Sequence, residues 1–183
     1  SLYRLMVSQV YRLGRWPVRA CHSSRASTTC SAQRGSPMKL AQAYAALENG
    51  GMLPQIRFLS AVIGPRGNIV GLPVRKDGPR VMSSATASSV LQALRGPVKR
   101  GTARSANSAH ALVYGKTGTS SRNEDALFVG LTQDFVGSIW LGHDRPAPMP
   151  GVHGGGMPAK SFSKLTDFYY VRLAQTRYAA SEE

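Results

Sequence analysis

The 183-residue sequence has few acidic residues, only two cysteines and no long apolar run. Its 9 Asp and Glu stand against 23 Lys and Arg, which gives a formal net charge of +14. No apolar run approaches the roughly 20 residues of a membrane span, and no charged segment leads into a signal-like apolar one. These absences exclude an integral membrane protein for the sequence as it stands. The first residue is Ser1 rather than Met, so we expect a cut N-terminus.

Acidic residues are missing altogether from the first quarter of the chain. Residues 1–47 contain seven Lys and Arg and no Asp or Glu, whereas the other 136 residues contain 16 basic and 9 acidic ones. Both cysteines, Cys21 and Cys30, lie in this acid-free part. They lack a second pair and a ladder of histidines, so their spacing indicates neither a metal site nor a structural disulfide. We assign them no role.

Residues 1–35 form a basic leader without a recognisable folding pattern. Arg, Ser, Cys and Thr dominate residues 15–31, and only residues 3–13 have a composition compatible with a short helix. Two interpretations remain open, a disordered basic tail and translation in a shifted frame at the upstream end of a gene. The absence of acids and the abrupt onset of regular patterning at Ser36 favour the second.

From Ser36 onward, apolar periodicity, caps and turn residues agree with one another. Ser36 as N-cap and Pro37 at the first helical position begin a predicted helix, which the glycines after Asn49 end. A β-hairpin follows, with strands over 57–63 and 68–72 around a turn rich in glycine and proline. This part of the chain therefore reads as helix followed by hairpin.

The second half of the chain continues with a helix, three strands and a last helix. Ser83 or Ser84 caps the first of these helices, and we expect Gly96-Pro97 to end it. Strands are predicted at about 110–118, 125–132 and 135–142. The last helix begins near Pro158 and carries one apolar face, formed by Phe162, Leu165, Tyr169 and Leu173. This order predicts an α+β fold with an antiparallel sheet flanked by helices.

A short polar run at the first of these three strands carries the sharpest chemical signal. On an exposed sheet edge it places an ammonium group and two hydroxyls in a row, and its glycine removes a side chain that would block a ligand. A peptide can add there as an extra strand through main-chain hydrogen bonds. Its terminal carboxylate can pair with the ammonium group and accept from the hydroxyls. A run this short is more often the polar end of a strand, so by itself it makes Lys116, Thr117, Gly118 and Thr119 only candidates for a substrate-binding site.

A wider resemblance extends over several blocks of sequence around this strand. In order, these blocks are residues 36–51, 100–103, 115–120, 125–130, 140–142 and 154–160. Over residues 36–183 the chain resembles the C-terminal portion of the transpeptidase domain of bifunctional (class A) penicillin-binding proteins. The resemblance implies a partial penicillin-binding, β-lactamase-like domain over 36–183, with the N-terminal part of the parent protein missing and residues 1–35 outside the pattern.

The resemblance implies acyl transfer on peptidoglycan stem peptides, at the periplasmic face of the inner membrane. In this family a serine of a Ser-x-x-Lys motif attacks the D-Ala–D-Ala bond, and an amine resolves the acyl-enzyme. Penicillins acylate the same serine. A Ser-x-Asn motif helps to move protons, and the Lys-Thr-Gly strand binds the carboxylate. The backbone N–H of Thr119 would supply half of the oxyanion hole. The family needs no metal and no organic cofactor.

The catalytic motifs of the family lie upstream of the segment matched here. Three strings fit their patterns: Ser36 with Lys39, Ser161 with Lys164, and Ser105 with Asn107. We interpret all three as coincidental, because Ser36 aligns as a helix start, Ser161 lies in the last helix, and Ser105 is only eleven residues before Lys116. We therefore assign no catalytic residue and expect the chain alone to be an inactive fragment.

Other candidate residues carry weaker signals. His143, Asp144 and His153 lie near the turn after the last strand, and we interpret them as exposed loop residues rather than metal ligands. A short basic cluster, Lys99, Arg100 and Arg104, lacks the interleaved aromatic residues of a nucleic-acid platform. We expect no nucleic acid partner. The alternative function is a non-enzymatic basic protein that binds nucleic acid or another polyanion. No oligomeric state is indicated.

Overall fold

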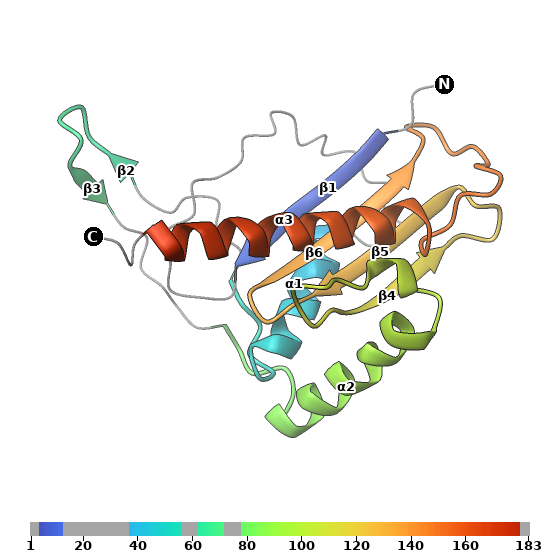
Figure 1. Cartoon of the computed structure of the whole chain (residues 1–183), viewed down its shortest axis with the longest axis horizontal. Helices are drawn as coiled ribbons and strands as arrows, with labels where there is room; N and C mark the ends of the chain where they lie inside the picture. The colour runs from blue at the N-terminus through green and yellow to red at the C-terminus, as the bar shows by residue number, and fades with distance from the viewer. Residues whose placement is uncertain (1–3, 13–36, 56–61, 72–77, 180–183) are drawn as a thin grey trace.

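A four-stranded antiparallel sheet forms the centre of the molecule. The computed structural model describes residues 4–12, 37–55, 62–71 and 78–179. The strand order is β1-β6-β5-β4, as Figure 1 shows. The strands are β1 (Arg4–Arg12), β4 (Tyr114–Thr119), β5 (Asp125–Leu131) and β6 (Phe135–Gly142). β4 therefore lies at one edge of the sheet, and β1 lies at the other.

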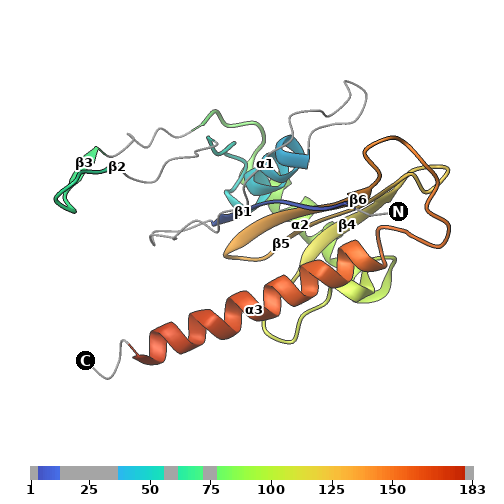
Figure 2. The same cartoon turned by 90° about the horizontal axis from the view of Figure 1, so that it is seen from above.

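Helices cover both faces of this sheet. The long helix α3 (Met157–Ala179) lies on one face, and α1 (Pro37–Glu48) lies on the other (Figure 2). α2 (Ser84–Arg100) contacts α1 and β4, and the short 3-10 helix η1 (Arg104–Ala106) contacts α2 and α3. This arrangement confirms the predicted α+β class with an antiparallel sheet flanked by helices.

The main core lies between the sheet and α3. Phe162 of α3 packs edge-on against Phe128 of β5, with ring centroids 5.2 Å apart, and against Phe135 of β6 at 5.5 Å. Glycines on the strands make this packing possible, because a Cβ at Gly130 would lie 2.8 Å from the Phe162 ring. A smaller core joins α1 to the opposite face, where Ala41 and Ala45 pack with Leu131 and Val136.

Most predicted elements after residue 36 are confirmed within the described residues. The first helix runs over Pro37–Glu48 and ends at Gly50 and Gly51, whose φ angles are 60° and 89°. Ser83 caps α2 by accepting from the Thr86 N–H. The proposed cap Ser36 and the cysteines Cys21 and Cys30 lie outside the described residues.

Three elements differ from the sequence-based expectations. α2 does not end at Gly96-Pro97 but continues to Arg100. The proline removes one donor, yet the Gly101 N–H donates to the Pro97 carbonyl at 3.0 Å, and Val98 is fully buried in the core. Burial of Val98 therefore outweighs the local helix-breaking signal.

The strand that carries Lys116 begins later than predicted, at Tyr114 rather than near residue 110. The His110 N–H donates to the Ser108 hydroxyl, and Arg95 of α2 donates to the Val113 carbonyl at 3.0 Å. These contacts satisfy backbone groups that a longer ladder would need, so the strand starts only after them.

The expectation that residues 3–13 could form a short helix is wrong. Arg4–Arg12 form strand β1 instead. β1 pairs with β6 in antiparallel register from Arg4 opposite Gly142 to Arg12 opposite Phe135. The edge of β6 supplies hydrogen-bond partners that a local sequence pattern cannot reveal.

A second, two-stranded sheet lies apart from the main sheet (Figure 1). Its strands are β2 (Val62–Ile63) and β3 (Ile69–Gly71), joined by a turn that Gly64 and Gly67 close with backbone hydrogen bonds. This confirms the described part of the predicted hairpin, whereas residues 56–61 and 72–77 lie outside the described residues. None of the described helices combines the length and apolar character that a membrane span requires.

Candidate substrate-carboxylate site

The predicted binding residues lie on β4, the edge strand of the sheet. β4 pairs with β5 so that Lys116 is opposite Val129 and Gly118 is opposite Leu127. Lys116 and Thr119 are exposed, and Thr117 and Gly118 are half-buried. Among the described strands, β5 alone pairs with β4. The structure therefore brings an ammonium group and two hydroxyls to one sheet edge.

The side chains of Lys116, Thr117 and Thr119 each have a hydrogen-bond partner within the chain. The Lys116 Nζ donates to the Thr117 carbonyl at 3.0 Å. The Thr117 Oγ1 lies 2.9 Å from the Thr102 Oγ1, and the Thr119 Oγ1 accepts from the Gly154 N–H at 3.1 Å. The two threonine hydroxyls are thus tied to two segments that are distant in sequence.

Close backbone packing behind the strand depends on glycine. A Cβ at Gly154 would lie 2.2 Å from the Leu127 carbonyl oxygen and 2.6 Å from that of Gly118, and one at Gly155 would lie 2.1 Å from the Thr102 carbonyl oxygen. Such distances are too short for any side chain, so these positions require glycine. A Cβ at Gly118 would instead make ordinary contact with the Leu127 side chain at 3.6 Å. The fold itself therefore leaves room for a side chain at Gly118.

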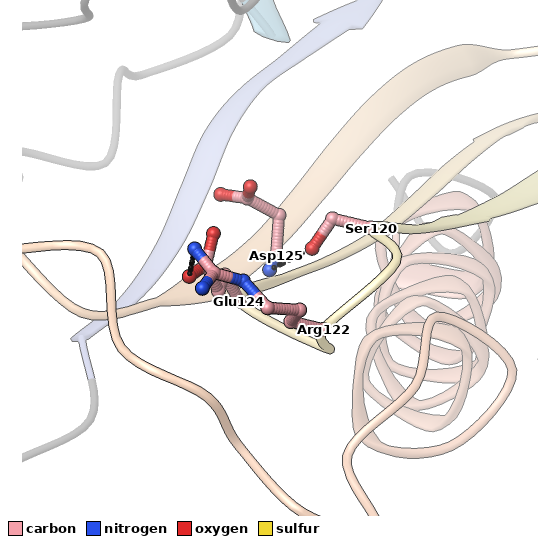
Figure 3. A network of polar contacts seen from close by, with 4 residues as sticks. All are labelled: Ser120, Arg122, Glu124 and Asp125. Carbon is pink, nitrogen blue, oxygen red and sulfur yellow. Dashed lines mark hydrogen bonds and ion pairs between the residues drawn. The ribbon is translucent and has the colours of Figure 1, made fainter.

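The turn between β4 and β5 is held by its own polar contacts, as Figure 3 shows. The Ser120 hydroxyl accepts from the Asp125 N–H at 2.9 Å, and the Ser120 N–H donates to the Asp125 carbonyl at 3.0 Å. Arg122 and Glu124 form an ion pair at 2.7 Å across the turn. Asn123 adopts a left-handed φ of 54°, and its carbonyl accepts from the Met149 N–H. These contacts define where β4 ends.

The serines that fit the catalytic patterns lie on other elements. Ser161 is half-buried within α3, and Ser105 lies in η1. In the described part of the chain neither serine hydrogen-bonds to Lys116, whose Nζ donates to the Thr117 carbonyl. Ser36 lies outside the described residues.

The weaker candidates do not gather into a site. His143 and Asp144 follow β6, and His153 precedes the glycines at the start of α3. Among the described residues, no three His, Cys, Asp or Glu side chains lie close enough to hold a metal ion. Lys99, Arg100 and Arg104 are exposed at the end of α2 and in η1.

Comparison with known proteins identifies the family. The family model described as "Penicillin binding protein transpeptidase domain" matches residues 15–136, two thirds of the chain. The chain belongs to the penicillin-binding protein transpeptidase family. The match begins within the basic leader and ends in β6.

Relatives in this family are penicillin-binding proteins 1A. The protein of that name from Clostridium perfringens (strain 13) is 30% identical over 153 residues, which are 79% of this chain and 22% of the relative. The one from Clostridium botulinum (strain Langeland) is 32% identical over 139 residues, 75% of this chain and 17% of the relative. The chain thus spans about a fifth of the length of these relatives.

Solved structures of transpeptidases share the fold. The D,D-transpeptidase domain of a peptidoglycan glycosyltransferase from Eggerthella lenta superposes with a TM-score of 0.62 at 23% identity, over 78% of this chain and 36% of that one. Penicillin-binding protein PonA1 from Mycobacterium tuberculosis superposes with a TM-score of 0.62 at 25% identity, over 71% of this chain and 37% of that one. The described sheet and helices therefore form part of a transpeptidase domain.

Two residues that contact the site, Thr102 and Gly154, were not predicted as site residues from the sequence. Thr102 and Gly154 belong to blocks that carry the resemblance, yet no local pattern indicates that they touch β4. The run of glycines at 154–156 is a signal for close backbone approach, but it does not show which strand is approached.

Proposed function

We propose that β4 binds the terminal carboxylate of a peptidoglycan stem peptide within a penicillin-binding D,D-transpeptidase. The observation that carries this proposal is that the exposed Lys116 and the hydroxyls of Thr117 and Thr119 lie on the same edge strand of a transpeptidase fold. A cation and hydroxyl donors in a row suit a carboxylate, because charge-assisted hydrogen bonds are the strong ones. Penicillins, which carry a carboxylate too, would occupy the same place. PonA1 has been solved in complex with penicillin V.

The position of β4 at the end of the sheet, without a second partner among the described strands, supports binding of an extended peptide. β4 has β5 on one side, and a ligand strand can add to the other side through main-chain hydrogen bonds. The room at Gly118 supports this as well, because the fold does not itself require glycine there. Close approach of a ligand backbone supplies a reason for the missing side chain.

The chemical step in the proposed parent enzyme is acyl transfer through a serine. A serine from a Ser-x-x-Lys motif would attack the D-Ala–D-Ala carbonyl, and the Thr119 N–H would stabilise the oxyanion. We propose that the serines at 36, 105 and 161 do not fill this role, so the chain by itself binds substrate without transferring an acyl group. The parent enzyme would act at the periplasmic face of the inner membrane.

Substrate binding is tested with N-acetyl-D-alanyl-D-alanine as the ligand. We expect the Lys116→Ala variant to bind at least about tenfold more weakly, the loss of one hydrogen bond to a charged group. Lys99→Ala is the matched control, since it removes an exposed charge of the same sign elsewhere. An equal loss in both variants, together with a steep dependence on salt, would instead indicate a binder of polyanions.

The absence of acylation is tested by intact-mass measurement after incubation with excess penicillin. We expect folded protein to remain unmodified. A stoichiometric adduct that peptide mapping places on Ser36, Ser105 or Ser161 would contradict the proposed lack of a nucleophile.

A further inference from the structure

The two threonine hydroxyls of the site form hydrogen bonds with residues outside β4. Thr102, just beyond α2, contacts Thr117, and the Gly154 N–H donates to Thr119. The segment that contains Gly154 also packs against Thr102, because a Cβ at the next residue, Gly155, would lie 2.1 Å from the Thr102 carbonyl oxygen. Three segments of the chain therefore meet behind the two hydroxyls.

These contacts determine which way the hydroxyls can act. A threonine hydroxyl has one hydrogen to donate and two lone pairs that accept. The Thr119 oxygen accepts from the Gly154 N–H at 3.1 Å, so its own hydrogen stays available for a ligand. In the pair at 2.9 Å, the same holds for Thr117 whenever Thr102 is the donor. A bound carboxylate accepts only, so it selects this direction.

We propose that Thr102 is a positioning residue that presents Thr117 as a hydrogen-bond donor to the carboxylate of the ligand. This inference rests on the proposed function of β4. A chain of hydrogen bonds from Thr102 through Thr117 to an anion strengthens each member by polarisation. The neighbouring backbone keeps Thr102 in place, since the Ala103 N–H donates to the Pro97 carbonyl at 3.0 Å and Ala103 is fully buried.

The first experiment measures the rotamer of Thr117 without any ligand. Three-bond NMR couplings to the Thr117 methyl carbon report its χ1 angle. We expect a single rotamer in the unmodified chain and rotamer averaging in Thr102→Val, which keeps the shape of the side chain but removes its hydroxyl. Thr102→Ser should restore the single rotamer. An unchanged Thr117 rotamer in Thr102→Val would overturn the proposal, whatever the chain binds.

The second experiment measures the affinity for N-acetyl-D-alanyl-D-alanine and for its C-terminal amide. We expect Thr102→Val to weaken binding of the acid about fivefold, the typical effect of one neutral hydrogen bond, and to leave binding of the amide unchanged. Thr102→Ser should bind like the unmodified chain. Equal loss for acid and amide would overturn the positioning role, because only the acid presents a carboxylate to the hydroxyls.

The two proposals fail in distinguishable ways. If Lys116→Ala weakens binding while Thr102→Val does not, the carboxylate site stands and the role of Thr102 is overturned. If Lys116→Ala has no effect, the proposed function fails, and the Thr117 rotamer alone then decides whether Thr102 orients its neighbour. Thr102 is exposed, and Thr102→Ala provides a second variant should the valine perturb folding.

Discussion

The hairpins β5–β6 and β2–β3 both contain apolar side chains, but these side chains are buried in the first hairpin and exposed in the second. In β5–β6 the side chains of Phe128, Leu131 and Ile139 are fully buried, because α3 covers one face of the sheet and α1 covers the other. In β2–β3 the side chains of Ile63 and Ile69 are 67% and 61% exposed.

The difference shows that apolar residues can predict a strand without predicting its burial. Two adjacent β-strands on their own are marginally stable in water and need a covered face. The β5–β6 hairpin has such cover on both faces, whereas β2–β3 lies apart from the main sheet (Figure 2). We therefore expect substitutions in the two hairpins to have unequal effects on stability.

The largest effect is expected from one substitution made in both hairpins. Ile139→Ala should lower the free energy of unfolding by about 2–5 kcal/mol, because it leaves a cavity in the core under α3. Ile63→Ala should change it by less than about 0.5 kcal/mol, because that side chain is 67% exposed. Urea unfolding monitored by tryptophan fluorescence measures both values. Equal losses would show that β2–β3 is covered in solution.

A smaller effect is expected at the turn between β5 and β6. The Thr132 Oγ1 is buried and accepts from the N–H groups of Asp134 and Phe135, both at 3.2 Å. Thr132→Val should cost about 1–3 kcal/mol, because it leaves two backbone donors without this acceptor. Thr132→Ser keeps the oxygen and serves as the control in thermal unfolding. If both variants lose the same stability, packing of the methyl group is the cause instead.

The smallest effect concerns the charge beside the same turn. Burial raises the pKa of the Glu48 carboxyl above its ordinary value of 4.5, and the nearby Asp134 carboxylate raises it further. A raised carboxyl pKa favours the protonated form in the folded state, so stability falls as the pH rises from about 4.5 through that raised pKa. Glu48→Gln removes the effect.

We therefore expect Glu48→Gln to stabilise the chain at pH 7 by less than about 1 kcal/mol, since water screens a half-exposed carboxylate. The gain should disappear when unfolding is measured below pH 4. A gain of the same size at both pH values would point to helix propensity at the end of α1 rather than to charge.

Burial also shifts the pKa of Tyr170, another residue near Asp134. Burial raises the pKa of its hydroxyl to about 12, with a smaller contribution from Asp134. Tyr170 therefore stays neutral across the pH range of these experiments and does not obscure the Glu48 effect.

Local patterns were sufficient to predict the elements whose ends depend on nearby residues. Gly50 and Gly51 end α1 with left-handed φ angles, and Ser83 caps α2 with its own hydroxyl. The end of α2 and the start of β4 could not be predicted in this way. They depend on the burial of Val98 and on the contact of Arg95 with the Val113 carbonyl, which join distant segments.

The same division holds for the candidate site. The order of Lys116, Thr117, Gly118 and Thr119 is given by the sequence. Because side chains alternate along β structure, this order places Thr117 and Thr119 on one face of the strand and Lys116 on the other. The resemblance to the family also lies wholly in the sequence. The residues that hydrogen-bond to the two hydroxyls cannot be predicted from residues 116–119 alone.

The sequence by itself therefore determined the α+β class, the helix caps and the chemical character of the binding strand. Only the tertiary structure decided that β4 is an edge strand, that Thr102 and Gly154 hold its hydroxyls, and that residues 4–12 form β1. The physical reason is the range of the interactions. Caps and periodicity act within a few residues, whereas strand pairing and close backbone packing join segments that only the folded chain brings together.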